Sequence, residues 1–374
     1  MFRRLSSSLP KDPEFPADLE KLGYSINEKD QIRSIANPEQ EFHFFISKNE
    51  RVREVQREAM DTCIRRELAP RFQAAGLENT LLPLNAGPTD PHVPILTSSN
   101  LATAKRLVLY FGESTQDLGI FAYRIIGQES IASGSALDFV HNIQSGKEGA
   151  DTAIVIANLG QLLWNRRGQR AMTMATWNGL PRKTGVSGPT RIDAIKNHIP
   201  GNEGVKEHVA SVFTAVEKLA RGDVAIDIIG IGEGAEEAVE YLDQNWERWE
   251  GKVRAMCVGM GFVWSVGDQV QNGRFKEFWS KRARAYLIHN EPVETPLYGR
   301  AQLGCNCFSS GEATFTECIM PRAYKSMLTF FQLVNDVPGY FEGEVEPQGD
   351  DSSRYVSWEE GVRSGVRAES PRTA

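Results

Sequence analysis

The stretch Ala225–Asp243 reads AIDIIGIGEGAEEAVEYLD and predicts a strand, a tight turn and a helix in direct succession. The isoleucine-rich first half is a short apolar run of the kind that forms a buried strand. Gly230, Gly232 and Gly234 then mark a turn where the backbone passes close to its neighbours. The alanine- and glutamate-rich remainder favours a helix. A strand that enters a helix in this way is typical of α/β proteins.

The turn resembles a nucleophile elbow that has lost its nucleophile. In an α/β-hydrolase the elbow reads G-x-S-x-G, and the sharp turn holds the serine oxygen clear of the sheet. Here residues 230–234 read GIGEG, so Gly232 stands at the serine position. We therefore expect the scaffold of a hydrolase without its reagent.

Other apolar runs of strand length alternate with helical segments along the chain. We expect strands at 106–111, 152–158, 224–229, 253–259 and 284–289, and helices at 49–68, 119–126, 134–144, 204–221, 235–249, 273–283 and 321–335. Residues 41–46 suggest an edge strand, and the prolines between 83 and 94 indicate a surface loop. Strands joined by helical crossovers predict a mostly parallel sheet covered on both faces. The predicted fold class is α/β, an α/β-hydrolase-like three-layer α/β/α sandwich.

The chain of 374 residues has the length of one large domain with tails. We expect residues 1–12 to be flexible, residues 13–341 to form a single domain, and the polar residues 342–374 to be disordered. Residues 165–202 make a gap longer than a compact domain normally contains, which suggests a cap or a binding loop.

Charge and cysteine content narrow the functional classes. The chain has 42 Lys and Arg against 49 Asp and Glu, a net charge of −7, which argues against a general attraction to nucleic acid. Its 5 cysteines lack the spacing of a disulfide framework and suit a reducing compartment, the nucleus or the cytoplasm. No apolar run approaches the roughly 18–20 residues that span a bilayer, so no membrane contact is expected.

Five longer blocks carry a family resemblance. They are FPADLEKLGYSINEKDQIRSI at 15–35, NERVREVQREAM at 49–60, QDLGIFAYRIIGQESI at 116–131, IPGNEGVKEHV at 199–209 and GIGEGAEE at 230–237. Together they resemble the fungal argonaute-binding protein family, the Arb2 domain, which also occurs at the C-terminus of some class II histone deacetylases. In animal relatives the elbow commonly keeps a serine and a later histidine, and the equivalent positions here look like Gly232 and Thr316.

The resemblance implies a Rossmann-like fold related to α/β-hydrolases, residence in the nucleus, and partners. These would be argonaute and a sister argonaute-binding subunit, in a complex that handles small RNA for heterochromatin formation and gene silencing. The chain would then meet small RNA indirectly, and a histone deacetylase complex is a further partner that the resemblance suggests.

The histidines speak against a serine triad. A triad in this fold needs a histidine after the last strand, and none of the chain's histidines lies there. The segment 311–324 offers Thr316, Glu317 and Cys318 instead. One alternative is that Glu233 acts as a carboxylate nucleophile, with Glu291 or Asp268 activating a water molecule. Glu233 is explained more simply by the helix dipole, which stabilises a carboxylate at a helix N-terminus.

Two cofactor patterns are weak. Residues 230–235 fit the G-x-G-x-x-A of a dinucleotide site, but the next strand has no acidic residue at its end, and at least two strands precede the motif. Cys305 and Cys307, with Cys318 downstream, suggest zinc but lack a fourth ligand. We expect neither a cofactor nor a metal.

The long loop combines cations and aromatic side chains. These are Trp164, Arg166, Arg167, Arg170 and Trp177, a mixture found in proteins that bind single strands. The simpler interpretation is a solvated loop, because no recognised RNA-binding module accompanies the cluster.

Three other features receive simpler interpretations. Trp246 and Trp249 have the helical spacing of core residues. His208 is expected to be a hydrogen-bonded structural histidine. Basic residues also cluster at 281–284, without an assigned role.

These observations lead to two hypotheses. The first is a non-catalytic scaffold, a pseudo-hydrolase within a nuclear argonaute-containing complex. The alternative is an active α/β-hydrolase-like enzyme of unknown substrate with a non-serine elbow. The degenerate elbow and its pocket would comprise Gly230, Gly232, Glu233, Gly234, Glu291 and Thr316.

Overall fold

The computed structural model describes residues 9–43, 45–261 and 269–348. The expectations for residues 1–8, for residues 349–374 and for Asp268 lie outside these described residues.

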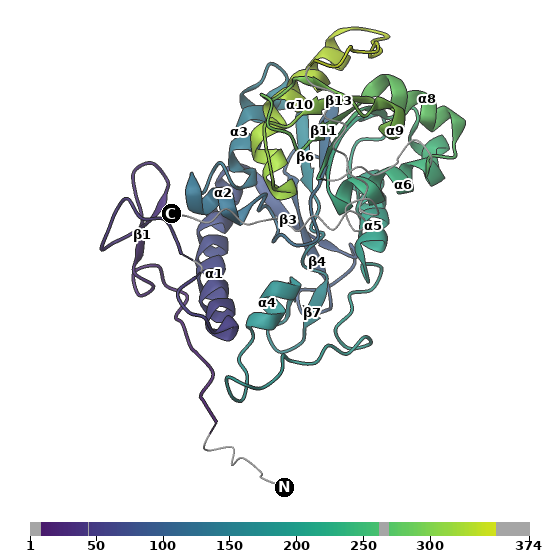
Figure 1. Ribbon diagram of the computed structural model, residues 1–374. Coiled ribbons are helices and arrows are strands. Elements are labelled where there is room, and N and C mark those ends of the chain that lie inside the picture. Colours follow the sequence, from purple (N-terminus) through teal and green to yellow (C-terminus); the bar gives the residue numbers. More distant parts are fainter. Residues whose placement is uncertain (1–8, 44, 262–268, 349–374) are drawn as a thin grey trace, which may run out of the picture.

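A nine-stranded sheet forms the centre of the domain (Figure 1). Its strands, in spatial order, are β3 (Leu77–Leu82), β4 (Val93–Ser98), β6 (Thr152–Ile156), β5 (Arg106–Phe111), β9 (Ala225–Ile231), β10 (Val253–Met260), β11 (Ala283–Leu287), β13 (Asn306–Ser309) and β12 (Pro296–Leu297). Neighbours from β6 to β13 are parallel, whereas β4 runs against β3 and β6, and β12 runs against β13. This is the strand order of the α/β-hydrolase fold, and it confirms the predicted fold class.

Helices cover both faces of the sheet (Figure 1). One face carries α1 (Glu50–Ala74), α2 (Tyr123–Gln128), α3 (Ala136–Ser145) and α10 (Ile319–Asp336); the other carries α5 (Val205–Leu219), α6 (Glu233–Trp249), α8 (Gly273–Arg282) and the short α9 (Arg300–Leu303). In β5, Leu107 and Leu109 pack on the α5–α6 side, while Val108 and Tyr110 pack on the α1–α10 side. Because both faces are covered, the parallel strands are mostly apolar, and the buried charges of Arg106 in β5 and Asp227 in β9 are paired with each other at 2.7 Å.

The edge strand predicted at 41–46 is wrong, and four strands of the central sheet, β3, β4, β12 and β13, were not predicted. The described residues of 41–46 form no strand, and the side chain of Phe45 is 84% exposed. The edge strand is β3, whose partner β4 begins inside the predicted proline loop. Pro94 lies in β4 before the residues that pair with β6, so its missing N–H interrupts no ladder on that side. The other predicted strands and helices are present, with bounds shifted by a few residues.

The long loop contains structure of its own. The strands β7 (Leu163–Asn165) and β8 (Arg170–Met172) pair as an antiparallel ribbon, and α4 (Met174–Gly179) follows directly. A second ribbon, β1 (Tyr24–Ile26) with β2 (Ile32–Ser34), precedes α1.

Ordered contacts extend slightly beyond the predicted domain. Asp12, expected in the flexible N-terminus, lies 2.8 Å from the buried Arg51 guanidinium. Glu342, expected in the disordered tail, lies 2.8 Å from Arg284, and both side chains are buried. Burying a charge is costly unless it is paired. These two pairs therefore attach Asp12 and Glu342, each one residue outside the predicted domain of 13–341, to the packed part of the chain.

None of the helices in the described residues is long and apolar enough to cross a membrane.

Candidate functional site

The elbow is present in its full backbone geometry. The strand β9 ends at Ile231, Gly232 follows, and α6 begins at Glu233. Gly232 has φ 54° and ψ −128°, a conformation that costs strain for any residue other than glycine. Its N–H donates to the carbonyl oxygen of Gly259 in β10, at 2.9 Å. The turn thus has the backbone geometry that presents a nucleophile in a hydrolase, but the residue at this position has no side chain.

The flanking glycines are explained by packing. A Cβ on Gly230 would lie 2.6 Å from the Cα of Ala235, and a Cβ on Gly234 would lie 2.3 Å from the carbonyl oxygen of Gly112. Both obstacles are backbone atoms, which cannot rotate away. Tight contact between α6, β9 and β5 therefore accounts for these two glycines without a bound dinucleotide.

Glu113 occupies the space in front of Gly232. Glu113 is the second residue after the end of β5, directly after Gly112. Its Oε1 lies 2.8 Å from the position that a Cβ on Gly232 would take. Glu113 is half-buried. Burial, followed by the charges of Glu317 and Glu233, raises the pKa of Glu113 to about 7. A carboxyl group from the loop after the neighbouring strand β5 therefore lies where a side chain at residue 232 would begin.

Sequence reasoning missed Glu113. The available signal was the FGES sequence after the strand 106–111, because the loop after this strand faces the elbow in a hydrolase and supplies an oxyanion N–H.

The other predicted elbow residues lie at different distances from this centre. Glu233 is exposed at the first turn of α6. Thr316 begins the short 3-10 helix η3 (Thr316–Cys318), and its Oγ1 packs against Gly261. Glu291 is exposed in the loop after β11, where its carbonyl oxygen accepts a 2.6 Å hydrogen bond from Ser309. The hydrogen bonds of Glu291 thus go to Ser309 at the end of β13 and to His289 in its own loop, through its backbone.

The segment that should carry a base approaches the elbow but brings an acid. The charge of Glu317, next to Thr316 in η3, acts on Glu113. Glu317 in turn lies 3.8 Å from the Arg124 guanidinium, which stacks on the ring of Phe315 at 3.6 Å. The place of a histidine base is therefore lined by Thr316, Glu317 and Phe315.

The tryptophans of the long loop are not available for stacking. Trp164 and Trp177 are each only 3% exposed, and the Trp177 Nε1 donates to the Thr190 carbonyl oxygen at 2.7 Å. Arg166 and Arg167 are exposed in the turn between β7 and β8, with Arg170 at the start of β8. The arginines face solvent while both tryptophans belong to the packing, which favours the simpler interpretation of this loop.

A buried polar network, also missed, fixes α4 against α1. Arg65 in α1 contacts the carboxylates of Asp117 at 2.8 Å and Glu58 at 2.5 Å. Tyr123 donates a 2.6 Å hydrogen bond to Asp117, and Thr176 in α4 donates a 3.0 Å hydrogen bond to Glu58. The loop after β5 and the helix α4 are thus held through one arginine.

His208 has the structural role that we expected. It is fully buried, its Nε2 accepts the Asn158 N–H at 3.1 Å, and its Nδ1 lies 2.7 Å from Asn202 Oδ1. Burial lowers the pKa of His208 to about 3. A neutral ring with its proton on Nδ1 satisfies both neighbours. Trp246 and Trp249 are buried in the core, as their spacing predicted.

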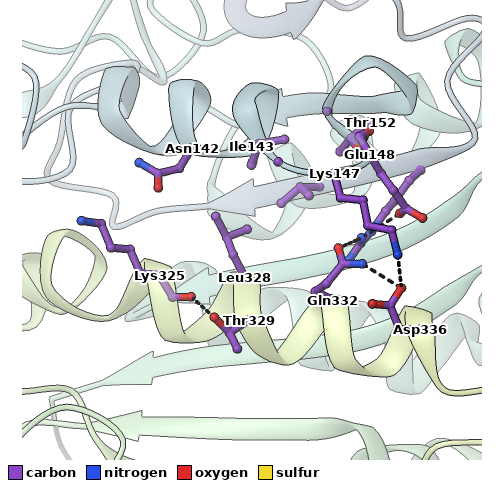
Figure 2. Close-up of a pocket in the computed structure, with 14 residues that line it drawn as sticks. Asn142, Ile143, Lys147, Glu148, Thr152, Lys325, Leu328, Thr329, Gln332 and Asp336 are labelled. Carbon is purple, nitrogen blue, oxygen red and sulfur yellow. Dashed lines mark hydrogen bonds and ion pairs between the residues drawn. The ribbon is translucent and has the colours of Figure 1, made fainter.

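One well-formed pocket lies far from the elbow. It has a volume of about 380 Å³ and sits between α3 and α10 (Figure 2). Its lining includes Arg106, the first residue of β5, whereas the elbow follows the last residue of β9. Because β5 and β9 are parallel, the pocket and the elbow lie at opposite ends of these strands. Figure 2 shows Lys147 and Gln332 both reaching Asp336, so much of its polar lining is paired internally.

Metal ligation finds no support in the parts of the chain that are described, because no group of three or more His, Cys, Asp or Glu side chains there could hold an ion. All five cysteines are buried as free thiols.

Comparison with known proteins gives one family and several distant structures. The model of the Arb2 domain matches residues 15–293. A predicted CIB-like hydrolase from Thermoplasma acidophilum shares 13% identity, with 69% of this chain and 98% of that chain covered and a TM-score of 0.37. AbyA5 shares 12% identity, with 79% and 77% covered and a TM-score of 0.37. The esterase Est22 shares 12% identity, with 76% and 91% covered and a TM-score of 0.33. No curated protein matches the sequence.

Proposed function

Because this chain belongs to the Arb2 domain family, we propose that it is a non-catalytic scaffold subunit of a nuclear argonaute-containing complex. The complex would act in small-RNA-directed heterochromatin formation and gene silencing. Its direct partners would be argonaute and a sister argonaute-binding subunit, with small RNA held indirectly and a histone deacetylase complex as a further partner. The family resemblance supports the partners, and the elbow supports the absence of catalysis.

The observation that carries the non-catalytic part is the pairing of Gly232 with Glu113. An acyl-transfer enzyme needs a nucleophile, a base and an orienting carboxylate. At this elbow the nucleophile position is a glycine in the strained conformation, and a carboxylate fills the space before it. A glycine at the nucleophile position is, by itself, a change of one residue and gives limited support. A carboxyl group in the space in front of the glycine supports the proposal further, because a side chain at residue 232 would collide with it.

We predict that restoring the serine alone will not restore hydrolysis. Gly232→Ser should cost about 1–3 kcal/mol of stability, because a non-glycine residue is strained there and its Cβ meets Glu113. The double variant Gly232→Ser, Glu113→Ala removes that contact and should recover part of the loss. Hydrolysis of p-nitrophenyl acetate should stay at the buffer rate for the wild type and both variants, because no histidine lies after the last strand, where a triad in this fold has its base. Wild-type turnover that disappears in Glu233→Gln or Glu113→Gln would contradict the proposal.

One observation favours the alternative, an enzyme with a non-serine elbow. A carboxyl with a pKa near 7 in a partly buried site suits general acid–base catalysis at neutral pH. If Glu113 had this role, wild-type activity on some ester or amide would rise through pH 7, and Glu113→Gln would abolish it while leaving the fold intact. A panel of acyl substrates assayed with both proteins separates the two functions.

The partner proposal is tested by purifying the tagged, endogenously expressed protein from nuclear extract, with and without RNase, and identifying the bound proteins by mass spectrometry. We expect argonaute and a sister subunit in both samples, because a scaffold makes protein contacts. An unrelated nuclear protein with the same tag is the control. Recovery of cytosolic metabolic enzymes in place of argonaute would overturn the proposal.

A further inference from the structure

A second pocket, of about 470 Å³, lies at the opposite end of the sheet from the elbow. It is bounded by the start of β10, the end of α6, the face and end of α8, and residues 339–341. Because β9 and β10 are parallel, the first residues of β10 are a full strand length away from Gly232. Nothing in the proposed function uses this region.

The lining of this pocket carries unbalanced positive charge. Four cations and two carboxylates line it, and both carboxylates are already paired. Glu250 lies 2.8 Å from Arg274, and Glu277 lies 2.7 Å from Lys281. Arg254 and Arg282 remain, and no described carboxylate lies within ion-pair distance of either.

These two arginines are held next to each other. The Arg282 Nη1 lies 3.5 Å from the Arg254 carbonyl oxygen. Burial, and then the charge of Arg254, lowers the pKa of Arg282. Arg254 stands at a register shift between β9 and β10, at the kind of bulge that redirects a side chain. Two adjacent like charges raise the energy of the empty pocket, and a bound anion would lower it.

Trp246, one of the residues that line the same pocket, carries a buried donor without a partner in the described part of the chain. Trp246 is 2% exposed, and its indole Nε1 has no hydrogen-bond partner among the described residues. An indole N–H can only donate, so an acceptor is what it lacks. Phe341, 66% exposed, adds an apolar wall.

We propose that this pocket binds a dianionic phosphate group, carried either by a small phosphate monoester or by a phosphorylated side chain of a partner. Two guanidinium groups match the charge of the dianion, and each can donate two parallel hydrogen bonds to phosphate oxygens. The pocket is open and can admit a group attached to a larger molecule.

The test is calorimetric titration of the full-length protein at fixed ionic strength with three probes. These are inorganic phosphate, an alanine-rich heptapeptide with a central phosphoserine, and the same peptide with serine. We expect the two phosphates to bind and the serine peptide not to bind. Tighter binding of the phosphopeptide than of inorganic phosphate assigns the site to a phosphorylated partner; equal binding assigns it to a small monoester.

Variants decide where the phosphate binds. Arg254→Ala with Arg282→Ala should weaken binding by at least about tenfold, because hydrogen bonds to a charged group have that effect. Arg254→Lys with Arg282→Lys keeps the charge but loses the planar fork, so binding should weaken less. The matched control is Arg166→Ala with Arg167→Ala, which removes two exposed cations elsewhere and should leave binding unchanged. Unchanged binding in the first pair, equal loss in the control, or equal binding of the serine peptide would overturn the proposal.

Discussion

Replacing Arg65 with alanine is expected to lower the free energy of unfolding by about 3–5 kcal/mol, because it leaves buried carboxylates without their counter-charge. The Asp117 side chain is 5% exposed and that of Glu58 is 16% exposed, and both contact Arg65 directly. Burial and the charges around it make this arginine the centre of a network across α1, α4 and the loop after β5. Urea denaturation followed by circular dichroism measures the change.

Arg66 is the matched control, because it is the next residue of the same helix. Its side chain is exposed and donates a 2.9 Å hydrogen bond to the Ala17 carbonyl oxygen. Arg66→Ala should cost no more than about 1 kcal/mol, as exposed contacts do. If both variants unfolded at the same urea concentration, the buried network would not have the role that its geometry indicates.

His208 is expected to make the protein sensitive to acid. The folded pKa of His208 is about 3, against 6.5 in an unfolded chain, so between these values the unfolded state binds a proton that the folded state does not. Stability contributed by neutral His208 is therefore fully present above pH 6.5 and is lost as the pH falls. The loss amounts to about 1.4 kcal/mol per pH unit, or roughly 2 kcal/mol by pH 5.

The comparison that isolates this effect is between the wild type and His208→Gln. The His208→Gln variant should be less stable than the wild type at pH 7.5, because the hydrogen bonds of the imidazole ring with Asn158 and Asn202 are disturbed. The difference in the free energy of unfolding between the two proteins should be about 2 kcal/mol smaller at pH 5 than at pH 7.5, because only the wild type loses the contribution of neutral His208. His141→Gln, at an exposed position on α3, is the control and should keep a constant gap. If the difference in the free energy of unfolding stayed constant for His208→Gln, the buried imidazole would not be the cause of the loss of stability in acid.

The sequence was sufficient for the elements whose signal is local. The run RLVLYF at 106–111 is a strand because six apolar or amphipathic residues in a row suit a strand buried on both faces, and the structure gives β5 the same bounds. The β9–α6 unit was predictable because three glycines within five residues, between an apolar run and a run of helix formers, indicate a tight strand-to-helix turn. The strand β4 was missed because Pro94 is a typical loop residue, and only the position of its partner strands shows that the missing N–H is harmless.

The candidate site divides in the same way. The sequence by itself determined that residue 232 is a glycine and that no histidine follows the last strand. From these two facts it predicted that no serine triad forms at the elbow. It did not bring Glu113 to the elbow, bury Trp164 and Trp177, or place Arg254 beside Arg282. Helix and strand patterns report on neighbours a few residues apart, whereas these contacts join residues that only the order and direction of the strands bring together. The tertiary structure alone decided what surrounds the missing nucleophile.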